Sequence, residues 1–192
     1  MGIGDCMVIY FVSNNEKKLK EVIDIMSLQL PGSMDIRGFK YKLEEIQSED
    51  SQKIVRDKTL KAFYKVRRPL FVEQTGMYIE DFGNLPGGLT QIVFESITAE
   101  KFCEIFGNRS NTNAIAKTII GYCDGKSIKT FEGSIRGKIA SEPRGSSSYQ
   151  WDSVFIPEGY AETFAEMGVL KNEISMRRKA VQAFTDYLKE RV

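Results

Sequence analysis

The chain has 192 residues, of which 42% are hydrophobic and 28% are charged, a composition that suits a globular protein with a sizeable core. Its 27 basic and 26 acidic residues give a net charge of +1, too little to steer the chain to nucleic acid or to an anionic membrane. No apolar run approaches the roughly 20 residues of a transmembrane helix, and the N-terminus lacks a signal-peptide pattern. We therefore expect one domain over 1–192, located in the cytoplasm, with neither a membrane nor a stably bound nucleic acid as partner.

The cysteine and histidine contents narrow the chemistry that is open to the chain. Three unclustered cysteines, Cys6, Cys103 and Cys123, favour neither a disulfide framework nor a zinc site. The sequence has no histidine, which excludes imidazole base chemistry and histidine metal ligation. Carboxylate oxygen remains as a metal ligand, and it suits Mg²⁺ or, as the alternative, Mn²⁺.

Strands and helices alternate in the first part of the chain. A β-branched apolar run predicts a buried strand at 7–12, and apolar residues at helical spacing predict a helix that runs through Leu19 and Met26. Asn15 is placed to cap that helix, and the N–H groups of its first turn form an anion site near Lys18. We further predict strands at 34–39 and 69–72 and a helix at 51–66.

Hairpin signals dominate the rest of the chain. We predict a helix at 98–106, and then strands at 114–123 and 126–131 across the turn Asp124-Gly125. A half-exposed strand at 134–140, a loop at 142–148, a strand at 154–156 and an amphipathic helix at 173–191 complete the prediction. This mixture predicts an α/β fold with a mixed sheet and two lobes around a groove.

Polar residues gather at three places that suit a nucleoside phosphate. Glu73-Gln74-Thr75-Gly76 follows the third predicted strand, where open α/β sheets tend to bind ligands and where a glycine turn is expected. Two aromatics beside a carboxylate, in Tyr149-Gln150-Trp151-Asp152, offer a stacking surface and a polar group. Ser175-Met176-Arg177-Arg178 adds positive charge for phosphates. Taken singly, each of these features is more often a structural core or a solvated surface.

Their joint order resembles that of the inosine triphosphate pyrophosphatase family. The resemblance is collinear over nearly the whole chain and is carried by Ser13-Asn14-Asn15-x-x-Lys18-Leu19-x-Glu21, Glu73-Gln74-Thr75-Gly76, Leu85-Pro86-Gly87-Gly88, Phe131-Glu132-Gly133, Tyr149-x-Trp151-Asp152, Phe164-Ala165-Glu166-Met167 and Lys171-x-x-x-Ser175-Met176-Arg177. It implies hydrolysis of ITP, dITP and XTP to the monophosphate and pyrophosphate by water attack at the α-phosphorus, with Mg²⁺ as cofactor. The fold that it implies is an elongated mixed sheet with flanking helices and two lobes around a central nucleotide-binding cleft. It also implies a homodimer.

The resemblance assigns expected roles to individual residues. It implies catalytic roles for Lys18, Glu73 and Gln74, and a metal site made by Glu45, Glu73 and Gln74. The substrate contacts that it implies come from Ser13, Asn15, Lys18, Thr75, Gly76, Tyr149, Trp151, Asp152, Lys171, Ser175, Met176 and Arg177. These cations and carboxylates agree with the chemistry, because phosphoryl transfer depends on charge neutralisation and positioning.

The sequence departs from the family pattern at two positions. Gln74 stands where the family has an aspartate, and Met176 stands where its Ser-His-Arg segment has a histidine. A neutral amide cannot accept a proton as a carboxylate can. Glu73, Glu45 or Asp81 can take over the proton or the metal, Gln74 can be an introduced change that traps substrate, or the chain binds nucleotides without turnover. Of these we expect a working or weakened pyrophosphatase.

Two further functions compete with this interpretation. Met176 can reshape the pocket toward modified pyrimidine or methylated nucleotides with the same chemistry. A groove of this kind can also bind double-stranded RNA by shape, although a net charge of +1 argues against that.

Overall fold

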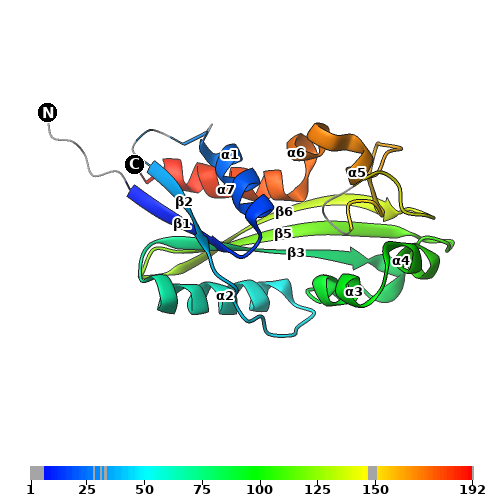
Figure 1. Ribbon diagram of the computed structural model, residues 1–192, viewed down its shortest axis with the longest axis horizontal. Coiled ribbons are helices and arrows are strands. Elements are labelled where there is room, and N and C mark those ends of the chain that lie inside the picture. Colours follow the sequence, from blue (N-terminus) through cyan, green and yellow to red (C-terminus); the bar gives the residue numbers. More distant parts are fainter. Residues whose placement is uncertain (1–6, 28, 31, 33, 147–150, 192) are drawn as a thin grey trace, which may run out of the picture.

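Seven strands in the described part of the chain form one mixed sheet (Figure 1). The computed structural model describes residues 7–191 except 28, 31, 33 and 147–150. The strand order is β2-β1-β3-β5-β6-β7, and β4 pairs with β3 beside this path. The strands are β1 (Met7–Ser13), β2 (Met34–Lys40), β3 (Leu70–Ile79), β4 (Pro86–Gly87), β5 (Asn113–Cys123), β6 (Ile128–Ile139) and β7 (Phe155–Pro157). Strand β1 is parallel to β2 and β3, whereas the remaining pairs are antiparallel, so the predicted mixed α/β sheet is confirmed.

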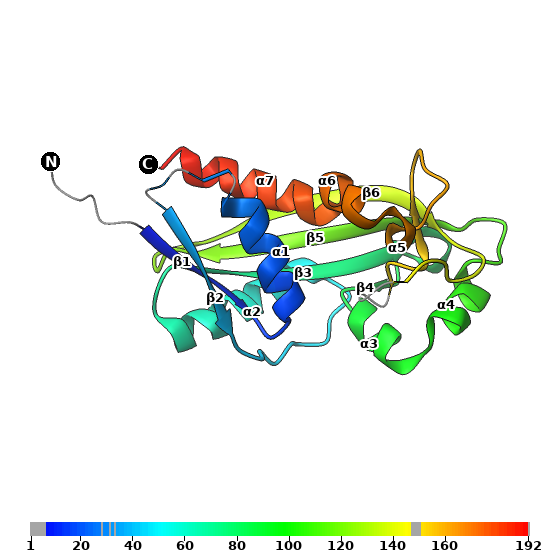
Figure 2. The ribbon, with the colours of Figure 1, turned by 45° about the horizontal axis from the view of Figure 1, so that its top comes forward.

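Helices flank this sheet, as predicted, and they cover both of its faces. Helices α1 (Glu16–Ser27) and α7 (Met176–Lys189) lie on one face and α2 (Ser51–Val66) on the other (Figure 1). Helix α7 lies along β6 and β5 (Figure 2). The other end of the molecule carries α3 (Thr90–Ser96), α4 (Ala99–Phe106), α5 (Phe164–Met167), α6 (Lys171–Ile174) and the short 3₁₀ helices at Glu80–Phe82 and Gly168–Leu170. None of the described helices has the length and hydrophobicity to traverse a bilayer.

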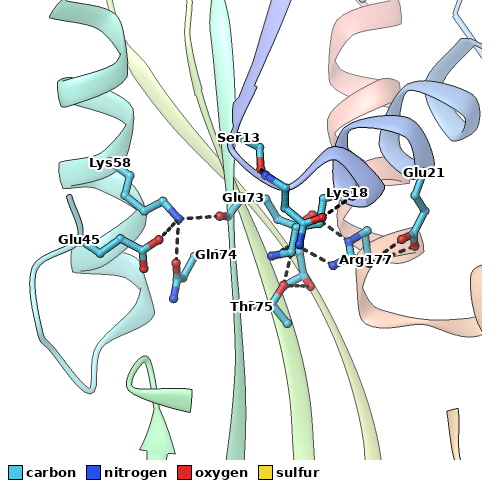
Figure 3. A network of polar contacts seen from close by, with 11 residues as sticks. Ser13, Lys18, Glu21, Glu45, Lys58, Glu73, Gln74, Thr75 and Arg177 are labelled. Atoms are coloured by element: carbon cyan, nitrogen blue, oxygen red, sulfur yellow. Dashed lines mark hydrogen bonds and ion pairs between the residues drawn. The ribbon is translucent and has the colours of Figure 1, made fainter. Parts of the chain in front are cut away.

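Alternation along β3 sends neighbouring side chains to opposite faces of the sheet. Phe71 packs in the cluster under α1 and α7, while Leu70 and Val72 pack in the cluster under α2. The same alternation separates Glu73 from Gln74, and Figure 3 shows the first beside Arg177 and the second beside Lys58.

The structure corrects several predicted boundaries. Strand β3 does not stop before the Glu73–Gly76 motif but continues through it to Ile79, so the predicted glycine turn is wrong. Gly76 lets β4 pair closely with this strand, because an ideal Cβ there would lie 2.5 Å from the Gly87 carbonyl oxygen of β4. The two strands predicted at 126–131 and 134–140 are one 12-residue strand, β6.

One predicted helix is divided in the structure, and one observed helix was not predicted. The predicted helix at 173–191 is divided, because Ser175 is extended (φ −63°, ψ 158°) and caps α7 while α6 ends just before it. Helix α3 was not predicted. Its seven residues are too few for a helical period to be read from the sequence.

Candidate active site

A cleft opens where β1 ends beside β3. The two parallel strands pair at Tyr10 and Phe11, after which β1 stops at Ser13 and β3 continues. The opening lies at the carboxyl end of β1, the edge at which sheets of this kind bind ligands. Its volume is about 730 Å³, within the range of small-molecule sites. The predicted site residues that line it are Ser13, Asn15, Lys18, Glu45, Glu73, Gln74, Thr75 and Trp151.

The turn into α1 fixes one wall of the cleft. The Ser13 hydroxyl accepts a hydrogen bond from the Asn15 N–H at 3.2 Å, and the Asn15 side chain accepts one from the Lys18 N–H at 3.1 Å. Asn15 therefore caps the 12-residue helix α1, as predicted. This turn places Ser13, Asn15 and Lys18 in the lining of the cleft, at the N-terminus of α1.

Glu73 is the centre of a buried ion-pair network on the α1 and α7 side (Figure 3). The Arg177 guanidinium donates to both Glu73 oxygens, at 2.8 and 3.1 Å, and Lys18 Nζ lies 3.2 Å from Oε1. Arg177 also donates from Nη1 to Glu21 at 2.9 and 3.0 Å. Burial alone would raise the pKa of Glu73, but Arg177 and Lys18 outweigh it and hold that pKa far below its usual range.

Lys58 is the corresponding centre on the α2 side. Its ammonium group donates to Glu45 Oε1 at 2.7 Å, to the Glu73 carbonyl oxygen at 3.0 Å and to Gln74 Oε1 at 3.1 Å (Figure 3). These contacts match the three N–H groups of an ammonium ion. Lys58 is only 8% exposed, and burial lowers its pKa while the Glu45 carboxylate opposes that shift. One buried cation thus links α2, β3 and the loop that carries Glu45.

The predicted base-binding residues form a third group. Trp151 lines the cleft and packs edge-on against Phe155, with ring centroids 6.3 Å apart. Asp152 and Lys171 are buried and form an ion pair of 2.6 Å. They line a second cavity of about 440 Å³, to which Glu21 also contributes. Arg177 connects the two cavities, because its carboxylate partners Glu73 and Glu21 line one each.

Comparison with known proteins places this architecture in a family. The Ham1 family matches residues 9–187, which is nearly the whole chain. This chain belongs to the Ham1 family.

Named relatives of this Ham1 protein are similar over almost their full length. A dITP/XTP pyrophosphatase of Pyrococcus horikoshii is 34% identical over 185 residues, covering 95% of this chain and 97% of that protein. An inosine triphosphate pyrophosphatase of Candida glabrata is 36% identical over 186 residues, with coverage of 94% and 96%. Among solved structures, a HAM1 protein from Coxiella burnetii has a TM-score of 0.81 at 20% identity, with coverage of 96% and 99%. That structure supports the fold alone.

Four residues that were predicted to contact the substrate have structural roles in this Ham1 protein. Ser175 caps α7 by accepting from the Arg178 N–H at 3.2 Å, and Met176 is buried in the hydrophobic cluster at the far end of the sheet. Gly76 allows β4 to approach β3, and Thr75 donates to Glu73 at 2.8 Å. Tyr149 lies outside the described residues.

The carboxylates that were weighed as replacements for position 74 differ in their surroundings. Glu45 faces the cleft, whereas Glu73 is committed to Arg177 and Lys18. Asp81 lies in the 3₁₀ turn after β3, away from the side chains that line the cleft.

Two residues of the site were missed by sequence reasoning. Lys58 carries a signal that could have revealed it, because it lies four residues from Ile54 and from Ala62 on the buried stripe of α2. A lysine on such a stripe needs a buried partner. Glu21 was part of a quoted motif but had no assigned role, and its partnership with Arg177 joins residues 156 positions apart.

Proposed function

We propose that this protein is a nucleoside triphosphate pyrophosphatase that hydrolyses ITP, dITP and XTP to the monophosphate and pyrophosphate. The observation that carries the proposal is one cleft in which Lys18, Lys58 and the N-terminus of α1 lie near Trp151, in a member of the Ham1 family. Relatives named dITP/XTP pyrophosphatase and inosine triphosphate pyrophosphatase support turnover over a silent nucleotide binder.

The triphosphate is held by positive charge and by backbone N–H groups. The first turn of α1 offers backbone N–H groups and the positive end of the helix dipole to an anion. Ser13, Asn15 and Lys18 stand at this turn, and all three line the cleft. Because Lys18 is paired with Glu73, a bound phosphate competes with that carboxylate for the ammonium group.

The base is held by Trp151 and selected by hydrogen bonds. An aromatic surface stacks any base, so stacking alone does not discriminate. Inosine and xanthine carry a 6-oxo group where adenine carries an amine, and donors such as Lys171 and Arg177 favour an acceptor at that position. The orientation of the Arg177 guanidinium is fixed by its hydrogen bonds to Glu73 and Glu21.

The chemical step is water attack at the α-phosphorus. Lys18 and the N-terminus of α1 stabilise the negative charge that develops on the phosphoryl oxygens. The Gln74 amide and the Glu45 carboxylate both touch Lys58, so they lie close together and are placed to orient the water. The contacts of Glu73 favour a role in holding Arg177 and Lys18 over direct contact with the reacting atoms.

The substrate is the complex of the nucleotide with a divalent metal ion, Mg²⁺ or alternatively Mn²⁺. A triphosphate supplies hard oxygen ligands that both ions prefer. A cytoplasmic location and a homodimer are also part of this proposal. The first follows from the nucleotide pool in which such substrates occur, and the second is supported by the family resemblance.

Activity with a panel of nucleotides tests the proposal. The full-length chain is incubated with Mg²⁺ and ITP, XTP, dITP, ATP or GTP, and pyrophosphate and orthophosphate are measured separately. We expect one pyrophosphate per monophosphate, with kcat/KM for ITP and XTP at least about a hundredfold above that for ATP. Release of orthophosphate, or equal rates for all five, contradicts the proposal.

A charge-matched pair of variants links this activity to the cleft. Lys18→Met removes a cleft cation and is expected to lower kcat/KM by about two orders of magnitude or more. Lys53→Met removes the same charge from an exposed position of α2 and should leave the rate near that of the wild type.

A further inference from the structure

The ammonium group of Lys58 lies in the cleft between the side chains of Glu45 and Gln74. Lys58 Nζ touches Glu45 Oε1 at 2.7 Å and Gln74 Oε1 at 3.1 Å, with its third N–H on the Glu73 carbonyl oxygen. Glu45 and Lys58 balance each other in charge, and the amide of Gln74 adds none. A carboxylate at position 74 would leave this place with a net negative charge, whereas Gln74 leaves it neutral.

The carboxylate of Glu73, next to Gln74 in the chain, does not replace the negative charge that position 74 lacks. Glu73 points to the other face of the sheet, where both oxygens accept from Arg177 and one also lies 3.2 Å from Lys18 Nζ. A metal ion at Glu73 would have to displace a buried bidentate arginine, which is among the strongest charge-assisted pairs in proteins.

These contacts do not fit a metal site held by the protein. Mg²⁺ takes six oxygen ligands in a near-octahedral arrangement; several are usually water, and the protein typically supplies one or two carboxylates. Among the described residues, no group of three or more His, Cys, Asp or Glu side chains is placed to hold a metal ion. Each oxygen-bearing side chain expected as a ligand, at positions 45, 73 and 74, already contacts an ammonium or guanidinium group.

We propose that this protein alone does not hold a divalent metal ion, and that the ion enters the cleft only as part of a metal–nucleotide complex. Lys58 would repel a bare ion at Glu45, because the two cations would share one carboxylate. The triphosphate changes this balance by bringing its own oxygen ligands and negative charge. The nucleotide part rests on the proposed function, whereas the behaviour of the protein without nucleotide does not.

Manganese titration of the full-length chain, followed by electron paramagnetic resonance of free Mn²⁺, tests the proposal. Without nucleotide, we expect no saturable binding by the wild type up to about 1 mM Mn²⁺. Gln74→Asp restores a second carboxylate and should bind Mn²⁺ at least about tenfold more tightly. Gln74→Asn is the matched control, because asparagine has the size of aspartate but no charge. This variant should bind Mn²⁺ as weakly as the wild type. Gln74→Glu repeats the comparison at the original side-chain length if Asp disturbs folding, which circular dichroism reports.

Two results would overturn the proposal. The first is saturable Mn²⁺ binding by the wild type without nucleotide below about 1 mM, lost in Glu45→Gln. The second is equal Mn²⁺ affinity in folded Gln74→Asp, Gln74→Glu and Gln74→Asn. A separate titration adds α,β-methylene ITP, and the proposal expects Mn²⁺ to bind wild-type protein in its presence. Failure of the nucleotide to bind at all counts against the proposed function but leaves the first titration unchanged, so the two failures are distinguishable.

Discussion

At the scale of single residues, Glu73 and Gln74 show how one step along a strand separates two electrostatic environments. Alternation in β3 sends Glu73 to Arg177 and Lys18, and it sends Gln74 to Lys58 on the opposite face. The first environment requires an ionised carboxylate because it contains two cations. The second tolerates a neutral amide because Glu45 already balances Lys58.

The Glu73 network predicts a loss of stability in acid. In the folded protein the pKa of Glu73 is held far below its ordinary value of 4.5, because Arg177 and Lys18 outweigh its burial. Below about pH 4.5 the unfolded chain takes up a proton at this residue that the folded protein does not. Glu73 therefore contributes stability that is fully present above this pH and is lost as the pH falls toward the folded pKa.

Urea unfolding between pH 3 and 6 measures this contribution. In Glu73→Gln the free energy of unfolding should fall less steeply with acidification than in the wild type, by up to about 1.4 kcal/mol per pH unit. Glu190→Gln, at an exposed position, should keep the wild-type slope. Identical slopes for wild type and Glu73→Gln would contradict the prediction.

At the scale of elements, the close contact between α7 and β6 positions the site. An ideal Cβ at Gly133 of β6 would lie 2.1 Å from the Met176 carbonyl oxygen and 2.4 Å from the Ala180 nitrogen, both in the backbone of α7. Only a residue without a side chain allows the helix to approach the strand this closely. Because Arg177 follows Met176, the close approach of α7 to Gly133 also positions the Arg177 guanidinium for its hydrogen bonds to Glu73.

Gly133→Ala should therefore push α7 away from the sheet. We expect a loss of about 1–3 kcal/mol in the free energy of unfolding, the usual cost of overpacking, measured by chemical denaturation. Gly32→Ala is the control, because nothing lies within 4 Å of a Cβ at that position, and it should change stability by less than about 0.5 kcal/mol. Equal stability of the two variants would show that α7 adjusts without strain.

At the scale of the whole molecule, α7 joins two hydrophobic clusters. Met176 packs with the cluster of β7, α4 and α5, and Phe184 packs with the cluster of β1, α1 and the middle of the sheet. Phe184 contacts Phe71 and Tyr122, with ring centroids 5.0 and 5.1 Å apart. The long strands β3, β5 and β6 run toward both ends of the molecule, and α7 lies along one part of them (Figure 2). The helix therefore ties both clusters to the same strands.

Phe184→Ala should destabilise the whole fold. Truncating a fully buried phenylalanine typically costs about 3–5 kcal/mol, which equilibrium denaturation detects as a lower midpoint. Val169→Ala, at a side chain that is 79% exposed, should stay within about 0.5 kcal/mol of the wild type. A cost below about 1 kcal/mol for Phe184→Ala would mean that α7 is not part of the common core.

Several features of the fold could be predicted from the sequence, because they depend on local patterns. The apolar run of β1, the Asn15 cap of α1 and the amphipathic stripe of α2 each specify their element within a few residues. The course of β3 through Glu73–Gly76 could not be predicted, because polar residues and a glycine are locally typical of a turn. Pairing with β5 on one side and with β4 at its end keeps this segment extended.

The order of the motifs in the chain identified the family, since such an order is a property of the sequence alone. It named some of the residues that line the cleft but not Lys58. The partners of those residues were decided by the tertiary structure. Burial of Lys58 against Glu45 and Gln74, and of Arg177 between Glu21 and Glu73, joins segments up to 156 positions apart. No local pattern records such pairs, because a buried charge takes its partner from whichever strand or helix the packing brings within reach.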